Sequence, residues 1–180
     1  MSLQFSAETQ LALDSARAQY PETRSLLIEA LKLAQKEFGH LSKEVLSYVA
    51  SETGFSESAV ASVATFYHNY QTRPVGKHLI TVCRTLSCEL AGGREVAEKF
   101  RELLGVDFGE TTEDGSITLL SAECLACCGT APAIQIDSDY FEAFRPDMCE
   151  KVIEALRQGR HPEGGAGVPG GMPEDKGSGV

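Results

Sequence analysis

The sequence predicts an α+β protein, with a helical N-terminal part followed by a small α/β unit that holds a mixed sheet. Up to about Thr72, apolar residues recur at helical spacing. After a turn at residues 73–76 the pattern changes to short β-rich runs separated by helical stretches. This change in the spacing of apolar residues, from helical to strand-like, predicts a boundary between a helical arm at residues 1–74 and an α/β domain at residues 75–159.

Three helices with clear end signals are predicted in the first part, after a weaker amphipathic run at residues 7–19. Gly39 is placed to end the first of them. Ser42 and Ser56 are placed to cap the beginnings of the next two, and Gly54 follows the second. Several short helices with brief connections are typical of a small bundle or helical arm.

The second part reads as strand, helix, strand, hairpin and helix. The predicted strands are residues 79–83, 117–120, 133–136 and 140–144, and the predicted helices are residues 96–104 and 146–158. The first strand–helix–strand unit predicts a right-handed crossover that joins parallel strands. With the hairpin, this gives a mixed four-stranded sheet. The last stretch, residues 160–180, is rich in glycine and proline, and we expect it to be disordered.

The charge balance excludes two classes of partner. The net charge is −10, which argues against nucleic acid and against anionic lipid, since both select clustered positive charge. No apolar run reaches the 18 or so residues that a membrane span needs, so no direct membrane insertion is expected. The first ten residues lack the pattern of a signal peptide, so a cytoplasmic location is expected.

The six cysteines are unevenly placed, and five of them fall within residues 83–128. In a reducing compartment such clustering indicates metal binding or redox chemistry. Cys83 and Cys88 form a C-x4-C pair, in which Cys83 closes the first strand and Cys88 is predicted to lie in the loop before the next helix. Cys124 and Cys128 form a C-x3-C pair just past the second strand. Because the ends of parallel neighbouring strands share one sheet edge, the two pairs are expected to meet.

Four thiolates without an accompanying histidine suit an iron–sulfur cluster or zinc. In a [2Fe–2S] cluster each iron takes two sulfides and two cysteine sulfurs. The thiolate-bound cluster is anionic, so it needs backbone N–H donors and a chain that wraps closely. Small residues stand where such a chain is expected: Gly92, Gly93, Gly129, Thr130 and Ala131.

Three stretches resemble the thioredoxin-like [2Fe–2S] subunit of NADH:quinone oxidoreductase (respiratory complex I). They are residues 63–67 with 74–78, residues 82–88, and residues 123–132. The resemblance covers about residues 10–158 and implies a thioredoxin-like fold for the α/β domain. It implies one [2Fe–2S] cluster, with Cys83, Cys88, Cys124 and Cys128 as its ligands. In thioredoxin-like folds the proline at the position of Pro132 follows a cis peptide bond, whereas X–Pro bonds are usually trans.

The resemblance also implies an electron-transfer subunit that is not catalytic alone. It would exchange single electrons with FMN, and FMN and NADH would be bound by a partner subunit that also carries a [4Fe–4S] cluster. The complex would hold the chain at the inner face of the cell membrane, or on the matrix side in a mitochondrion. This chain has no flavin motif and no Rossmann G-x-G-x-x-G placed between a predicted strand and a predicted helix, which fits that division of roles.

Some residues outside the ligand set have two interpretations. Cys127 stands where the family commonly has a small residue, so it is either a bystander thiol or a substitute ligand if Cys128 is lost. Cys149 is predicted to be a buried structural thiol on the last helix. Phe66, Tyr67 and Tyr70 form an aromatic stripe that we expect to pack between the helical arm and a partner. The carboxylates of Asp137 and Asp139 are expected to be solvated surface groups.

Four other functions remain as alternatives. The equivalent [2Fe–2S] subunit of an NAD-dependent formate dehydrogenase or an NAD-reducing hydrogenase would have the same chemistry. A free-standing ferredoxin would not need the helical arm. A structural zinc protein with four cysteines would be redox-silent. A thiol–disulfide oxidoreductase would need a C-x-x-C motif at a helix N-terminus, whereas the Cys124–Cys127 pair lies in a loop.

Overall fold

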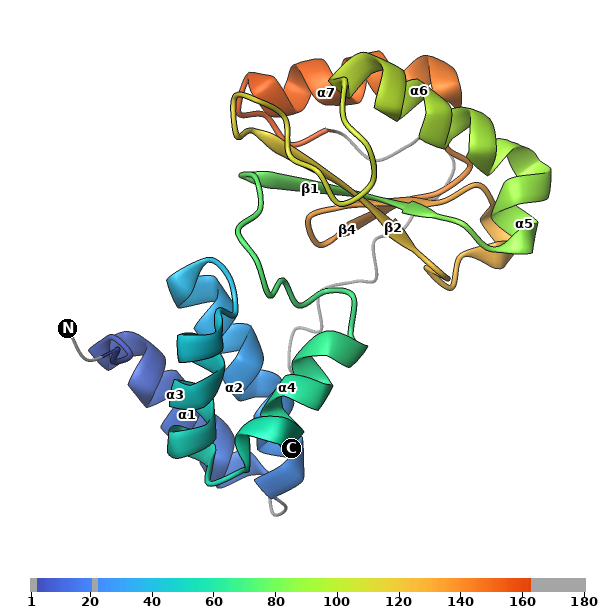
Figure 1. The fold of residues 1–180 in the computed structure, drawn as a ribbon. Coiled ribbons are helices and arrows are strands. Elements are labelled where there is room, and N and C mark those ends of the chain that lie inside the picture. Colours follow the sequence, from blue (N-terminus) through green and yellow to red (C-terminus); the bar gives the residue numbers. More distant parts are fainter. Residues whose placement is uncertain (1–2, 21–22, 163–180) are drawn as a thin grey trace, which may run out of the picture. The chain divides into compact units, whose positions relative to one another are not determined.

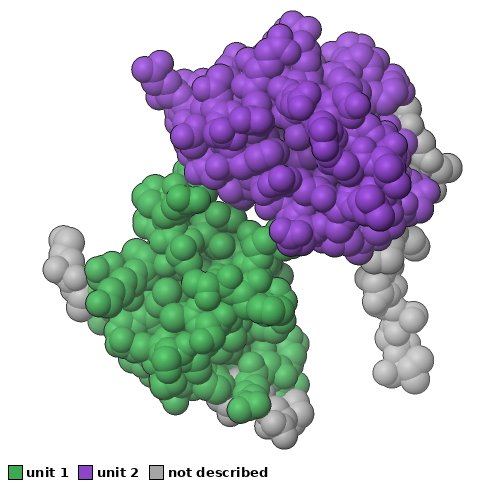
Figure 2. Space-filling view, turned by 45° about the vertical axis from the view of Figure 1, so that its right-hand side comes forward, with its two compact units in different colours: residues 1–75 green, residues 76–180 purple. Residues whose placement is uncertain are grey.

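The protein was analysed as a computed structural model that describes residues 3–20 and 23–162. The chain divides into two compact units, residues 1–75 and residues 76–180. Figure 1 shows the course of the chain, and Figure 2 colours the two units green and purple. Most of the predicted tail, from residue 163 onward, lies outside the described residues.

The first unit consists of helices that end where the local signals predict. The helices are α1 (Ala7–Gln19), α2 (Thr23–Phe38), α3 (Lys43–Thr53) and α4 (Glu57–Phe66). The side chains of Ser42 and Ser56 cap α3 and α4 by accepting hydrogen bonds from the N–H groups of Val45 and Ala59. Gly54 ends α3 with φ of 76°, a conformation that side chains of other residues disfavour. The helical prediction for this part is confirmed.

One face of each helix contributes to the core of this unit. The fully buried side chains of the core include Leu13, Leu26, Leu31, Leu41, Val49 and Val60. Tyr70 of the aromatic stripe is buried, and its hydroxyl donates to the carbonyl of Ile28 at 2.9 Å. Phe66 and Tyr67, in contrast, are exposed. Among the described residues, the helices are all too short or too polar to cross a membrane.

The second unit is built on a four-stranded mixed sheet with the strand order β2-β1-β3-β4. The strands are β1 (His78–Cys83), β2 (Ile117–Ala122), β3 (Ile134–Ile136) and β4 (Asp139–Phe141). β1 pairs with β2 in parallel and with β3 in antiparallel, and β3 and β4 form a hairpin. The predicted α+β class with a mixed four-stranded sheet is confirmed.

Helices α6 (Arg94–Leu104) and α7 (Cys149–Arg157) lie along one face of this sheet (Figure 1). Their apolar faces and the sheet enclose a core that includes Phe100 and Phe144, whose rings stack 5.8 Å apart. Cys149 is fully buried in this core, as predicted for a structural thiol, and burial raises its pKa to about 12. A short 3₁₀ helix, η3 (Pro146–Met148), forms the beginning of the predicted last helix.

The turn that leads into β2 is held by the carboxylate of Asp114. The side chains of Ser116 and Thr112 and the N–H of Ser116 donate to this carboxylate and lower its pKa to about 2. Since the pKa is lower in the folded state, the carboxylate stabilises the fold above about pH 4. The stabilisation of the fold by the Asp114 carboxylate is lost as the pH falls through about 2, where the carboxylate is protonated.

We therefore expect Asp114→Asn to lower the free energy of unfolding at pH 7, and the difference from the wild type to shrink as the pH falls toward 2. Urea unfolding measured across this pH range checks the prediction. Glu113→Gln, which removes the neighbouring exposed carboxylate, is the control for net charge. A pH-independent difference for Asp114→Asn would contradict the prediction.

Candidate metal centre

Both cysteine pairs follow strands that end side by side. Cys83 closes β1 and lies opposite Ala122, the last residue of the parallel strand β2. The N–H of Arg84 donates to the carbonyl of Ala122 at 2.9 Å, which keeps the two chain segments together past the strand ends. Cys124 lies two residues after Ala122, just past the end of β2. The segments that carry the two pairs therefore leave the sheet at the same edge.

The Cys83–Cys88 pair is almost entirely buried, with 2% and 1% of the two residues exposed. The two residues belong to one buried apolar cluster with Ala122, Leu125 and Ala133. The hydroxyl of Thr85 lies 3.1 Å from the sulfur of Cys83. The prediction that Cys88 lies in a loop is wrong, because it ends the short helix α5 (Leu86–Cys88). The segment η1 (Glu89–Gly93), which is kinked at Gly92, joins this helix to α6.

Two glycines shape the turn after Cys88. Gly92 has φ of 103°, which interrupts the helical path between α5 and α6. At Gly93 an added Cβ would lie 2.7 Å from the carbonyl oxygen of Cys88 and 2.9 Å from its carbonyl carbon. Only glycine allows the backbone to approach Cys88 so closely.

The Cys124–Cys128 pair is exposed, and its two sulfurs lie 4.0 Å apart. A tetrahedral metal with metal–sulfur bonds of about 2.3 Å, as zinc has, holds two sulfurs about 3.8 Å apart. The separation therefore already fits one shared metal. Cys128 begins the 3₁₀ turn η2 (Cys128–Thr130), and the N–H of Ala126 donates to the sulfur of Cys124 at 3.3 Å.

The backbone points several N–H donors at the sulfurs. For Cys83, burial opposes ionisation, but hydrogen bonds from Thr85 and from the N–H of Leu125 prevail and lower its pKa. For Cys88, burial and the neighbouring Cys83 raise the pKa, although the N–H of Ala133 donates to this sulfur. Cys83 is therefore the member of this pair that ionises first. N–H donors of this kind stabilise thiolates bound to a cluster.

The sulfurs are arranged as two pairs. The two pairs lie past the ends of the neighbouring strands β1 and β2, at one edge of the sheet. Among the described residues, histidine, cysteine and acidic side chains form no group of three around a single metal position. Two thiols for each of two irons is the donor set of a [2Fe–2S] cluster. The residues present therefore fit such a cluster by the type, pairing and hydrogen bonding of their sulfurs.

The fifth thiol of this region belongs to Cys127, which is half-buried. Its sulfur donates to the carbonyl of Leu125 at 3.3 Å. Burial and the nearby carboxylate of Glu142 raise the pKa of Cys127 to about 11, so this thiol is protonated at neutral pH. The peptide bond between Ala131 and Pro132, which follows this loop, is cis.

Two apolar side chains stand exposed beside the buried pair. Leu86 and Leu90 are 72% and 79% exposed, and they flank Cys88 on α5 and η1. Both leucines therefore lie at the surface next to the candidate redox centre.

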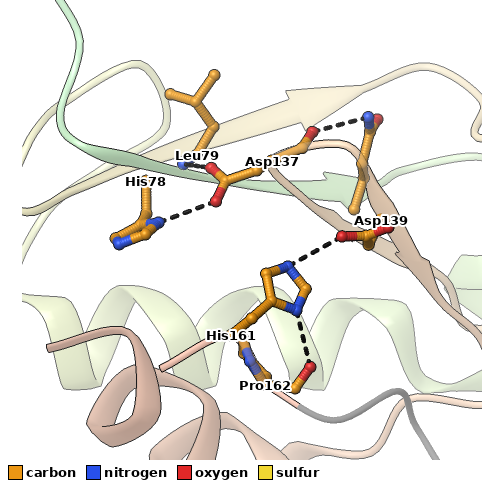
Figure 3. Close-up of polar contacts among 7 residues, drawn as sticks. His78, Leu79, Asp137, Asp139, His161 and Pro162 are labelled. Atoms are coloured by element: carbon orange, nitrogen blue, oxygen red, sulfur yellow. Dashed lines mark hydrogen bonds and ion pairs between the residues drawn. The ribbon is translucent and has the colours of Figure 1, made fainter. Parts of the chain in front are cut away.

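At the end of β1 opposite Cys83, polar contacts join the strand to the turn between β3 and β4 (Figure 3). The carboxylate of Asp137 lies 2.9 Å from Nδ1 of His78 and accepts the N–H of Leu79 at 2.8 Å. Asp139 makes a 3.0 Å ion pair with His161. The expectation of a solvated surface carboxylate holds for Asp139, whose side chain is 60% exposed, whereas Asp137 is partly buried and bonded to β1. Strand pairing brings β1 next to the β3–β4 turn, and this proximity cannot be predicted from local sequence because His78 and Asp137 are 59 positions apart. Since β1 begins here and ends at Cys83, these contacts lie away from the thiols.

The residues between 13 and 157 match the model of the thioredoxin-like [2Fe–2S] ferredoxin family. The chain is 37% identical to an NADH-quinone oxidoreductase subunit of Rhizobium meliloti, over 88% of this chain and 96% of the relative. It is 36% identical to an NADH-quinone oxidoreductase subunit of Mycobacterium tuberculosis, over 77% of this chain, and spans 55% of that relative's length.

Among solved structures, an NAD⁺-reducing [NiFe]-hydrogenase in the air-oxidised state shares the fold with a TM-score of 0.61 and 18% identity. The alignment covers 72% of this chain and 23% of the hydrogenase chain. The family match spans both the helical unit and the sheet unit with its cysteine pairs. The chain belongs to the thioredoxin-like [2Fe–2S] ferredoxin family.

Proposed function

We propose that this chain is the electron-transfer subunit that carries one [2Fe–2S] cluster in the NADH-oxidising module of NADH:quinone oxidoreductase. The observation that carries the proposal is the convergence of two thiol pairs at one sheet edge. The 37% identity to the Rhizobium meliloti relative, over nearly its whole length, supports this parent complex. The likeness to the hydrogenase chain concerns the fold alone.

In this proposal Cys83 and Cys88 hold one iron, and Cys124 and Cys128 hold the other. The cluster supplies a site that accepts and releases one electron at a time. The chain's own residues would hold it in place: α5 and η1 fix the buried pair, the N–H of Ala133 donates to the sulfur of Cys88, and the N–H of Ala126 donates to the sulfur of Cys124. The exposure of Cys124 and Cys128 leaves one side of the site open to a partner.

In this proposal FMN and NADH are bound by a partner subunit, which also carries a [4Fe–4S] cluster. The chain would then lie at the inner face of the cell membrane through the complex. It would exchange single electrons with the flavin and catalyse no reaction alone. We also propose that residues 1–74 and 75–159 are separate domains, a helical arm and a cluster-binding domain.

Anaerobic purification followed by absorption and EPR spectroscopy, before and after dithionite, tests the proposed cofactor. A brown protein with two irons and two sulfides per chain, which gains an EPR signal on reduction, is the expected result. A colourless protein that holds one zinc would contradict the proposal. The role in the complex is tested by adding NADH. The holoprotein should be reduced by NADH only when the flavin subunit is present.

The exposed leucines beside Cys88 are proposed to form the docking surface for that flavin subunit. Replacing both by glutamine, in Leu86→Gln/Leu90→Gln, should weaken binding about tenfold or more, because apolar anchors dominate interface energies. The cluster spectrum should not change. Calorimetric titration of the flavin subunit with holoprotein measures the effect. Leu11→Gln, at an equally exposed leucine of the helical unit, is the matched control. Equal binding by the double variant and the control would refute this docking surface.

A further inference from the structure

Five sulfurs, rather than four, gather at the sheet edge that carries the candidate cluster site. The apolar cluster around Cys83 and Cys88 includes Leu125, and the half-buried Cys127 packs against it. Cys124 and Cys128, by contrast, are exposed. Cys127 is therefore inside the site and faces the buried pair, although the four-ligand set does not include it.

The loop backbone explains why Cys127 turns inward while its neighbour Cys128 faces solvent. Ala126 has φ of 62°, in the left-handed region that an L-residue with a side chain disfavours. Cys127 follows with φ of −100° and ψ of 39°, and the η2 turn begins at Cys128. The position of a Cβ at Gly129 has no heavy atom within 4 Å, so the loop has room to move on its outer side.

We propose that Cys127 is a reserve ligand that replaces Cys128 when the sulfur of Cys128 is absent or leaves the iron. This inference rests on the proposed [2Fe–2S] function. Cys124 and Cys127 then hold the outer iron as a C-x2-C pair, a spacing common in metal sites. A rotation of the loop about Ala126 carries the sulfur of Cys127 outward and releases the left-handed conformation.

The exchange balances without an added oxidant or reductant. The iron–sulfur bond to Cys128 breaks, and that sulfur takes up one proton. The thiol of Cys127 releases one proton as its sulfur forms the new bond to the same iron. No electron moves, and the number of thiolates on the cluster stays at four. Where Cys128 has been replaced by alanine, Cys127 simply supplies the missing thiolate.

Cys128→Ala tests the proposal, since alanine, unlike serine, offers no oxygen ligand. The full-length variant, reconstituted anaerobically with iron and sulfide, should retain two irons and two sulfides per chain. Its EPR g values should differ from those of the wild type. In Cys127→Ala/Cys128→Ala the iron content should fall at least about tenfold, as expected when a ligand is lost. Cys128→Ala/Cys149→Ala is the control for loss of a second thiol, and it should behave like Cys128→Ala.

Two outcomes would overturn the reserve-ligand role while leaving the proposed function intact. The first is an iron-free Cys128→Ala protein with an unchanged far-UV circular dichroism spectrum, beside a wild type that binds its cluster. The second is a Cys127→Ala/Cys128→Ala protein that keeps its cluster. If Cys128→Ala fails to fold, Cys128→Ser is compared with Cys127→Ala/Cys128→Ser. If Cys127 is a reserve ligand, the EPR spectra of these two variants should differ. Identical spectra would refute the proposed role of Cys127. A wild type without a cluster contradicts the proposed function itself.

Discussion

Replacing Cys83 with serine is expected to remove the [2Fe–2S] cluster or sharply reduce its content. Cys83 is buried, and it ionises most readily in its pair because Thr85 and the N–H of Leu125 donate to its sulfur. A serine oxygen at this position has a much higher pKa and is a poorer ligand for iron than a thiolate. Loss of one ligand from the buried pair leaves one iron with a single cysteine. Iron and sulfide analysis, with the visible spectrum, measures the effect.

Cys149→Ala is the matched control for this prediction. It also removes a buried thiol from the same unit, but it does so in the core between the sheet and α7, away from the cysteine pairs. We expect this variant to keep a full cluster and to lose only some stability, because the small cavity it leaves costs about 1 kcal/mol. A wild-type visible spectrum for Cys83→Ser would refute the assignment of Cys83 as a ligand.

Gly93→Ala is expected to disrupt the site through the backbone of Cys88. With φ of −63° and ψ of −28°, Gly93 has helical geometry, in which alanine is normally the more favourable residue by about 0.5–1 kcal/mol. Here the added Cβ would lie 2.7 Å from the carbonyl oxygen of Cys88. Since this atom belongs to the backbone, it cannot move aside as a flexible side chain could. The clash therefore outweighs the helix propensity, and we expect a net destabilisation of about 1–3 kcal/mol.

The clash also has a functional consequence, because relieving it shifts Cys88 and hence one sulfur of the buried pair. We expect Gly93→Ala to bind less iron than the wild type and to lose it faster to a chelator. Gly129→Ala provides the comparison, because a Cβ there meets no heavy atom within 4 Å. Chemical denaturation of the reconstituted proteins measures stability, and loss of visible absorbance with a chelator measures cluster retention. Equal stability and retention in the two variants would contradict the close approach at Gly93.

Local sequence signals predicted the helical unit and the places where chemistry is concentrated. Ser42, Ser56 and Gly54 act through hydrogen bonds and backbone conformations within a few residues of themselves, so their roles are readable without the fold. The cysteine pairs and the strands that precede them were readable for the same reason. The resemblance supplied the thioredoxin-like fold and the register of the four ligands. The fold is confirmed, and the ligand set stays a prediction.

Other features depend on pairing between residues far apart in the chain. The strand order β2-β1-β3-β4 and the pairing of Cys83 with Ala122 bring the two cysteine segments to one edge. The same sheet brings His78 to Asp137, a contact between residues 59 positions apart that the sequence did not suggest. The helical placement of Cys88 was missed, because it depends on the packing of Gly93 against the backbone of Cys88, which local sequence does not reveal.

The amino-acid sequence by itself thus determined the helix ends, the strand-forming runs and the concentration of thiols, since each follows from short-range conformational preference. Only the tertiary structure decided which sulfurs are buried, which N–H groups face them and which way Cys127 points. These properties arise from contacts between segments about 35 to 60 residues apart, whose energies local sequence does not encode.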